Sequence, residues 1–577
     1  MNKFKYFVAI SSILISGCTS ILDTDNLVKK DTSNFPSNEI DAEQMITGIY
    51  ASYINGLNYP ETDPFFVFEL AGDDRLGGGS TSNKGSQCLD RFMNSNTSNF
   101  ENMWGVRYSG IFRANTAIGS LDKVTEWTTD EKRSQLIGEA HFLRAYFYLD
   151  LVQLFGEIPL VLTPEAQNLP KSPADDIYAQ IAYDLLTAIE NFPSLKYPDY
   201  GDGHASKWSA EALLARAFMF YTGFYEKSDM PVAGSDKKVT KEMVINYLED
   251  CINNSGNGLV SDQRNLWPYT NPYTAKSYNY AKNNDLVWEG DENKEVMFAI
   301  KMSNTSDFSN IVHNRIVEFF NPRKTTPDAF PFVAQGYSNG PVCSKLWTDW
   351  VSDPDYAGDY RRKGSICDRA VELPKYPGDK NKEVENTGLF AKKYLGCGAY
   401  DEGDANSTLR SSYSFFYGGQ DDKQLGLTQS LILIRFADVL LMHSELTNGK
   451  VVSQGLSGMN LVRKRANLPA VPYSLEALKK ERRYELCFEA LRWNDLRRWG
   501  DVENIVKNQV GNPILNKGKS DLYKFDSNFD FMTRYKETGG GFFKIPESQV
   551  TLSDGVLKQN PGWESKYDWV KLPYSTI

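Results

Sequence analysis

The sequence has 577 residues, of which 41% are hydrophobic and 24% are charged, as is usual for a globular protein. Its formal net charge is −11, which excludes nucleic acid and anionic membrane surfaces as principal partners, because both are bound through a basic face.

The first feature in chain order is an export signal. Lys3 and Lys5 precede a mostly apolar run at 6–15, which is too short to span a bilayer but is typical of a signal peptide. Small residues stand directly before Cys18, as in a bacterial lipobox. We therefore expect residues 1–17 to be removed and Cys18 to be acylated. An ordinary signal peptide with a coincidental cysteine is the alternative.

Polar residues at 18–39 are expected to form a lipidated tether, and 40–577 a single domain. Apolar residues recur at helical spacing in this domain, which predicts helices at 41–53, 104–121, 174–189, 241–253 and 475–499. Three further segments, 138–149, 210–221 and 431–441, each place an arginine among small and large apolar residues. Such segments are typical of stacked tetratricopeptide-like helix pairs, so the fold class is predicted to be mainly α.

Long stretches between these helices lack helical periodicity. Residues 256–430 hold most of the Asn, Gly, Pro and Tyr clusters, together with short strand-like runs such as 295–301. A second glycine-rich stretch runs over 73–96. A helical scaffold with long irregular loop insertions is typical of binding proteins, because the helices hold the frame and the loops make the contacts.

Aromatic residues are abundant, with 11 Trp, 32 Tyr and 32 Phe. Flat rings in polar loops suit sugar rings, which pack on them while hydroxyls bond to polar neighbours. The stretch 264–288 is the richest, and its leading candidates for glycan binding are Trp267 and Trp288, followed by Tyr269 and Tyr273. For both tryptophans, packing in the core is an equal alternative.

Two other places are candidates for glycan binding. Asp73, Asp74 and Arg75 open a glycine-rich segment that continues to Gln87, where charged groups could bond to vicinal hydroxyls. A capped turn is the structural alternative there. Tyr337, in a glycine-rich loop, is a weaker third candidate.

Catalytic and metal chemistry find little support in the sequence. Six cysteines follow Cys18 without a CxxC motif, and the four histidines are scattered, so neither a zinc site nor a cofactor is predicted. On a helix, Arg482, Glu485, Glu489 and Arg492 would form one stripe of alternating charge. The two glutamates are therefore expected to pair with arginines rather than to act as catalytic carboxylates.

Specific motifs stand in the last third of the chain. Residues 461–469 (LVRKRANLP), 480–500 (KERRYELCFEALRWNDLRRWG), 543–546 (FKIP) and 559–563 (QNPGW) resemble the signature of the SusD/RagB family, and 143–160 resembles its R-A-x-x-Y-F … F-G-x-V-P motif. The lipobox fits as well. The sequence departs from the family pattern at Asn467 and Ala490, where glycine is usual.

The resemblance implies a helical domain of four tetratricopeptide-like helix pairs with a loop-rich face. It also implies a non-catalytic lipoprotein, anchored in the outer membrane and exposed on the cell surface. Such a protein captures oligosaccharide or polysaccharide for a SusC-like TonB-dependent transporter. The alternatives are a protein–protein scaffold of tetratricopeptide type, a glycoside hydrolase, and a relative that captures a peptide or haem.

Overall fold

The computed structural model describes residues 35–56, 63–94, 100–201, 203–306, 312–324, 327–333, 336–400, 408–418, 422, 424–525 and 529–563. The predicted signal peptide and Cys18 lie outside these residues. None of the described helices is long and apolar enough to cross a membrane.

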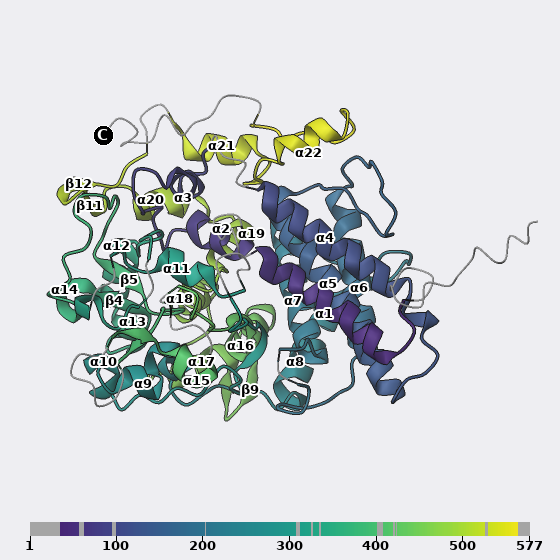
Figure 1. The fold of residues 1–577 in the computed structure, drawn as a ribbon, viewed down its shortest axis with the longest axis horizontal. Helices are drawn as coiled ribbons and strands as arrows, with labels where there is room; N and C mark the ends of the chain where they lie inside the picture. The colour runs from purple at the N-terminus through teal and green to yellow at the C-terminus, as the bar shows by residue number, and fades with distance from the viewer. Residues whose placement is uncertain are drawn as a thin grey trace, which may run out of the picture.

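Eight main helices form the scaffold on the right and in the centre of Figure 1. They are α1 (Glu39–Gly56), α4 (Glu101–Ile118), α5 (Asp130–Phe155), α6 (Ala174–Asn191), α7 (Lys207–Phe224), α8 (Lys241–Asn254), α16 (Phe436–Leu446) and α18 (Leu475–Leu486). The helices pack in pairs, α1 on α4, α5 on α6, α7 on α8 and α16 on α18, and α4, α6 and α8 also pack on the next pair. The prediction of a mainly helical, tetratricopeptide-like scaffold is confirmed.

Side-chain caps fix the starts of these helices. Thr129 precedes α5 and accepts a hydrogen bond from the amide of Lys132, and Thr240 does the same for Met243 in α8. At α7 the Ser206 hydroxyl accepts from the amide of Ser209, while the Ser209 hydroxyl accepts from the amide of Ser206, which makes a reciprocal capping box.

Short elements form the loop-rich half, at the left of Figure 1. Its helices are α9 (Pro272–Ala275), α10 (Asn279–Lys282), α11 (Arg315–Phe320), α12 (Ser344–Ser352), α13 (Arg361–Ser365), α14 (Arg369–Glu372) and α15 (Tyr413–Tyr417). Antiparallel strand pairs join them, β4 (Ile366–Asp368) with β5 (Leu389–Ala391) and β6 (Gly398–Ala399) with β7 (Arg410–Ser411). The described residues between 256 and 430 are therefore built from short helices and strands joined by irregular segments.

The remaining elements lie around this frame. They are the helices α2 (Pro64–Ala71), α3 (Lys84–Asp90), α17 (Gly458–Arg465), α19 (Arg492–Trp499), α20 (Glu503–Gln509), α21 (Phe531–Glu537) and α22 (Glu547–Leu552). Helices α21 and α22 lie at the top of Figure 1, and α2 and α19 lie near its centre. Three strand hairpins join β1 (Met230–Pro231) to β2 (Lys238–Val239), β9 (Val451–Ser453) to β10 (Leu456–Ser457), and β11 (Pro513–Asn516) to β12 (Lys519–Leu522).

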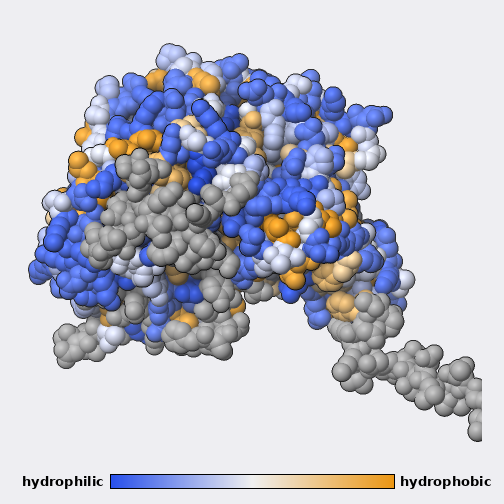
Figure 2. Space-filling model, turned by 90° about the horizontal axis from the view of Figure 1, so that it is seen from above, coloured by the Kyte–Doolittle hydropathy of each residue, from blue (hydrophilic) through white to orange (hydrophobic). Residues whose placement is uncertain are grey.

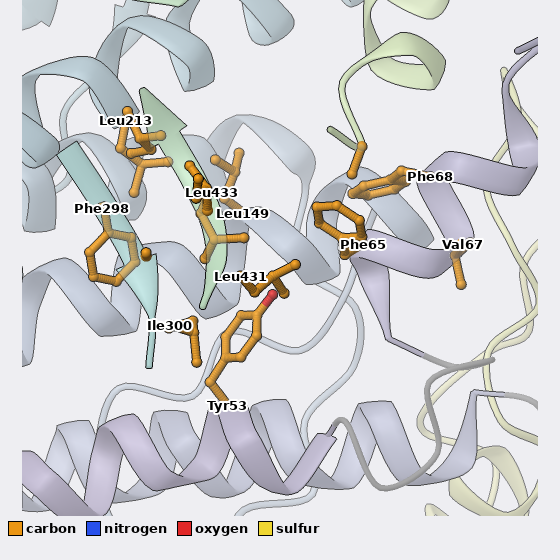
Figure 3. Packing of buried hydrophobic residues seen from close by; sticks show 14 of the residues in the cluster. Tyr53, Phe65, Val67, Phe68, Leu149, Leu213, Phe298, Ile300, Leu431 and Leu433 are labelled. Atoms are coloured by element: carbon orange, nitrogen blue, oxygen red, sulfur yellow. The ribbon is translucent and has the colours of Figure 1, made fainter. Parts of the chain in front are cut away.

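One apolar cluster extends from Ala42 to Trp563 and joins the helical scaffold to the loop-rich half. In Figure 3, Leu433 lies beside Leu149, and Phe65 and Phe68 of α2 lie across from them; all four residues line one pocket. Leu433 belongs to strand β8 (Leu431–Arg435), which pairs with β3 (Val296–Ile300). The face seen from above is mostly hydrophilic, with apolar side chains in separate small areas (Figure 2).

Two helix predictions are wrong in part. Residues 431–435 are strand β8, and the helix begins only at Phe436, because the aliphatic run pairs with β3 in the core. The segment 475–499 is two helices, α18 and α19, separated by a turn. Phe488 and Ala490 have φ values of 67° and 60° in this turn, and a right-handed helix cannot continue through such residues.

Candidate functional site

The glycine-rich candidate segment lies inside the protein. Asp73 is fully buried and accepts hydrogen bonds from Arg492 at 2.7 Å, while Asp74 accepts from Arg483, also at 2.7 Å. Burial alone would raise the pKa of Asp73, but Arg483 and Arg492 hold it well below its usual range. These carboxylates tie α2 to the C-terminal motif, so they are not available to sugar hydroxyls.

Arg75 and Gln87 are also committed to internal contacts. Arg75 is 2% exposed and donates to Glu69 at 2.5 Å and to the carbonyl of Gly340 at 2.8 Å. The Gln87 amide donates to the carbonyls of Gly78 and Ser80. These side chains are buried and bonded within the protein, so this segment has a structural role instead of the predicted ligand contacts. Its charged residues form ion pairs and do not make the capped turn that was the alternative.

Trp267 and Tyr269 belong to the core. Trp267 is 1% exposed, with its ring 5.3 Å from that of Tyr394 and 5.1 Å from the ammonium of Lys393. Tyr269 is fully buried and donates its hydroxyl to the carbonyl of Gly364 at 2.8 Å. Neither ring has a face open to solvent, so we remove both from the candidate glycan contacts.

Trp288 and Tyr273 remain partly exposed, and both pack on α15. The Tyr273 ring stacks on Phe415 at 4.9 Å with an interplanar angle of 27°, and it meets Phe416 edge-on at 4.8 Å. The Trp288 ring lies 5.3 Å from Phe416. We call Tyr273, Trp288, Phe415, Phe416 and Tyr417 the α15 aromatic cluster.

Local hydrogen bonds hold this cluster in place. Asn271 caps α9, because its carboxamide oxygen accepts from the amides of Tyr273 and Thr274. The amide nitrogen of Asn271 donates to the hydroxyl of Ser412 at 3.0 Å, which joins α9 to the start of α15. Gly418, with φ of 68°, ends α15. These contacts fix the backbone of α9 and of α15, from which all rings of the cluster except that of Trp288 extend.

The cluster has an exposed edge with polar neighbours. Tyr417 is 47% exposed and donates its hydroxyl to Asp291 at 2.9 Å. The amide of Asn304 donates to the carbonyl of Tyr417 at 2.7 Å, and the guanidinium of Arg410 lies 4.4 Å from the Phe415 ring. Aromatic faces beside hydrogen-bonding groups are what recognition of a sugar ring requires.

Tyr337 lies on another part of the surface. Its ring is partly exposed and packs on Phe319 of α11, with a centroid distance of 4.8 Å, beside the guanidinium of Arg323 at 5.6 Å. Tyr337 therefore belongs to a separate aromatic pair and is not brought into the α15 aromatic cluster.

Residues 413–417 were not among the candidates predicted from the sequence. Their sequence, Tyr-Ser-Phe-Phe-Tyr, follows two serines and precedes two glycines. Four aromatic residues within five positions of a polar stretch are a pattern that could have marked this segment as a candidate for glycan binding.

The charged residues of the C-terminal motif do not form the predicted single stripe, because α18 ends at Leu486 and Arg492 begins α19. Glu485 and Glu489 lie instead in a buried ion-pair network. Glu485 accepts hydrogen bonds from Arg435 at 2.6 Å and from Arg361 at 2.8 Å, and it pairs with Arg465 as well. Glu489 pairs with Arg435 and with Lys393. The prediction that Glu485 and Glu489 pair with basic residues is confirmed.

The electrostatics of this network also argue for a structural role. Burial alone would raise the pKa of Glu485, but Arg465, Arg435 and Arg361 hold it far below its usual range, so this carboxylate stays ionised and does not act as a proton donor. Among the described residues, no group of three or more His, Cys, Asp or Glu side chains could hold a metal ion.

Two family models match the sequence. One, described as starch-binding associating with outer membrane, matches residues 25–219, and the other, described as SusD family, matches residues 351–563. Together they cover more than half of the chain. The chain belongs to the SusD/RagB family. SusD-like proteins P2 and P38 of Formosa agariphila are 23% and 22% identical to it, over 98% and 92% of this chain and 100% of each relative.

Solved structures of SusD type share the fold. A laminarin binding SusD-like protein matches with a TM-score of 0.66 and 23% identity, over 91% of this chain and 100% of its own. Surface glycan-binding protein A from Bacteroides thetaiotaomicron, in complex with laminarihexaose, matches with a TM-score of 0.66 and 18% identity, over 90% of this chain and 99% of its own. The SusD-like helical scaffold expected from the motifs is therefore confirmed.

Proposed function

We propose that this SusD-family protein is a non-catalytic glycan-binding protein of the cell surface, and that the glycan binds on the α15 aromatic cluster. The observation that carries the proposal is the partly exposed group of rings formed by Tyr273, Trp288 and α15, with Tyr417 at its open edge. The two solved relatives whose names mention laminarin or laminarihexaose support the same ligand class.

The physical basis is stacking on rings that are already in place. A sugar ring that covers a partly exposed indole or phenol should gain about 1–3 kcal/mol, by analogy with base stacking on aromatic platforms. Because Tyr273 and Trp288 already pack against Phe415 and Phe416, little side-chain freedom is lost on binding. Asp291 and Asn304 stand beside Tyr417, within reach of sugar hydroxyls.

A glycan array with the soluble protein, from residue 19 onward, tests the ligand class. Titration calorimetry with the best oligosaccharide should then show that Trp288→Ala weakens binding about ten- to a hundredfold, since each 1.4 kcal/mol is a factor of ten. Phe112→Ala, which removes a 51% exposed ring on α4, is the control and should leave affinity unchanged. Wild-type affinity in Trp288→Ala would refute the α15 aromatic cluster as the binding site.

The proposed partner is a SusC-like TonB-dependent transporter, and the proposed anchor is an acylated Cys18 in the outer membrane. The family membership and the lipobox at 14–18 support both. Several acyl chains would anchor the protein stably, since each buried methylene contributes roughly 0.8 kcal/mol. Cys18→Ala should abolish surface labelling of whole cells, and unchanged labelling would refute the anchor.

The proposal assigns no catalytic residue. The paired carboxylates of the C-terminal motif, Glu485 and Glu489, are buried and bound to basic side chains. Purified protein should release no reducing ends from a polysaccharide that it binds. Release that a single Asp or Glu substitution abolishes would reverse this assignment.

A further inference from the structure

A groove of about 70 Å³ lies between the connection from α6 to α7 and strand β3. Tyr197, Tyr200 and His204, from the connection between α6 and α7, line one side of it. The other side consists of strand β3 and the residues on either side of that strand, with Asp291, Glu292 and Lys301 among them. We call this surface the Tyr197 groove.

One hydrogen bond links the groove to the α15 aromatic cluster. Asp291 lines the groove, and its carboxylate accepts the hydrogen bond from Tyr417, the exposed end of the cluster, at 2.9 Å. Trp288 precedes Asp291 by three positions in the chain. The rim of the groove at Asp291 therefore lies next to Tyr417, the exposed end of the cluster.

Two rings stand ready in the groove. Tyr197 is partly exposed, and its centroid lies 6.3 Å from that of Tyr200, with an interplanar angle of 60°. Both are held at their hydroxyls: Tyr197 donates to the carbonyl of Glu292 at 2.8 Å, and Tyr200 accepts from Asn257 at 3.1 Å. The rings are thus oriented before any ligand binds, which lowers the entropic cost of binding.

Carboxylates dominate the charge at the mouth of the groove. Asp291 and Glu292 line it and Glu289 is exposed nearby, whereas the ammonium of Lys301 lies 3.7 Å from Glu292. Burial raises the pKa of Tyr197, and the negative charges of Glu292 and Glu289 raise it further, because they disfavour the phenolate. A ligand that brings a further negative charge to this place would be repelled by these carboxylates.

We propose that the Tyr197 groove is a second subsite, which takes a neutral sugar ring of the same glycan chain that covers the α15 aromatic cluster, and that it disfavours rings carrying carboxylate or sulfate. This inference rests on the proposed function and narrows its ligand class to neutral glycans long enough to reach both surfaces.

Calorimetry with neutral oligosaccharides of two lengths tests the subsite. A panel of malto-, laminari-, xylo- and manno-oligosaccharides supplies a hexasaccharide and a trisaccharide of the series that binds. Tyr197→Ala should weaken binding of the hexasaccharide about five- to tenfold and of the trisaccharide less than twofold, because only the longer chain reaches both surfaces. Tyr197→Phe, which keeps the ring, should restore most of the hexasaccharide affinity.

The charge preference has its own measurement. The same hexasaccharide, oxidised to carboxylate at its primary hydroxyls or at its end, should bind the wild type at least about fivefold more weakly at low salt, and Glu292→Gln should recover part of that loss. The melting temperatures of all variants should differ from that of the wild type by no more than that of the Phe112→Ala control does. The affinity changes then do not arise from unfolding.

The outcomes separate the two proposals. If Trp288→Ala weakens binding while Tyr197→Ala weakens both lengths equally or neither, the subsite is refuted and the proposed function stands. If the oxidised chain binds the wild type as tightly as the neutral one, the charge preference is refuted. If no oligosaccharide or polysaccharide binds, the proposed function and the subsite fail together.

Discussion

The carboxylate of Glu69 accepts a hydrogen bond from the backbone amide of Ala490, with an N–O distance of 2.7 Å across 421 positions of sequence. This bond fixes the turn between α18 and α19, where Phe488 and Ala490 have positive φ. The same carboxylate accepts from Arg75. One residue of α2 therefore holds both the glycine-rich segment and the turn of the C-terminal motif.

Ala490→Gly should not destabilise the protein. An alanine with φ of 60° carries a strain of about 1–2 kcal/mol, which glycine relieves, while glycine costs roughly 0.5–1 kcal/mol in chain entropy. We expect a change in the free energy of unfolding between zero and about 1 kcal/mol of stabilisation, measured by urea denaturation. Ala179→Gly, in the interior of α6, is the matched control and should cost about 1 kcal/mol. Equal losses in both variants would contradict the strain argument.

Glu485→Gln should be strongly destabilising. Glu485 pairs with Arg361, Arg435 and Arg465 in the protein interior. Asp359, Glu295 and Glu489 also pair with these arginines, but the substitution removes one of the buried negative charges that balance them. We expect a loss of about 3–5 kcal/mol in the free energy of unfolding. Glu503→Gln removes an exposed pair with Lys507 on α20 and should cost less than about 1 kcal/mol. A loss below about 1 kcal/mol for Glu485→Gln would show that the network does not stabilise the fold.

Glu211 should make stability fall as pH rises. Burial is the main cause that raises its pKa from the ordinary 4.5 to about 8, with Lys207 opposing the shift at 3.6 Å. Because the folded-state pKa is the higher one, the folded state binds this proton more tightly. The resulting stabilisation is complete below pH 4.5 and is lost as pH rises to about 8.

Glu211→Gln should remove this pH dependence, because the amide cannot ionise. Relative to the wild type, urea midpoints should be similar at pH 5, and the variant should be more stable by roughly 2–4 kcal/mol at pH 8.5. Glu242→Gln, at an exposed position of α8, should keep the wild-type dependence. Parallel curves for Glu211→Gln and the wild type would rule out Glu211 as the titrating group.

The C-terminal motif predicted the family and with it the fold, but it did not predict the backbone conformation of the motif itself. Read as one periodic stripe, 475–499 predicts a single helix, because periodicity does not detect a local change of φ. The signal was present in the departures from the family pattern. Glycine is usual at 467 and 490, and Asn467 and Ala490 both have φ of 60° here. A position where a motif usually has glycine indicates left-handed backbone. Applied to position 490, this rule would have predicted two helices in 475–499.

Exposure of individual rings could not be predicted from composition. Trp267 and Trp288 stand in the same Asn- and Pro-rich stretch, yet the first is buried under Tyr394 and Lys393 and the second stays partly exposed. The residues that decide this come from distant parts of the chain. The same holds for Asp73, whose partner Arg492 lies 419 positions away.

Trp267→Ala and Trp288→Ala should therefore differ in stability. Loss of a core tryptophan typically costs roughly 3–5 kcal/mol, and Trp267 is 1% exposed, so this variant should melt far below the wild type or fail to accumulate. Trp288 contacts Phe416 and Tyr413 and keeps part of its surface in solvent, so its loss should cost less than about half as much. Calorimetric melting of both variants measures the difference. Trp267→Phe, which retains an aromatic ring in the cavity, should recover part of the lost stability. Equal melting temperatures for the two alanine variants would mean that Trp267 is not packed in the core, and Trp267 would return to the set of candidate glycan contacts.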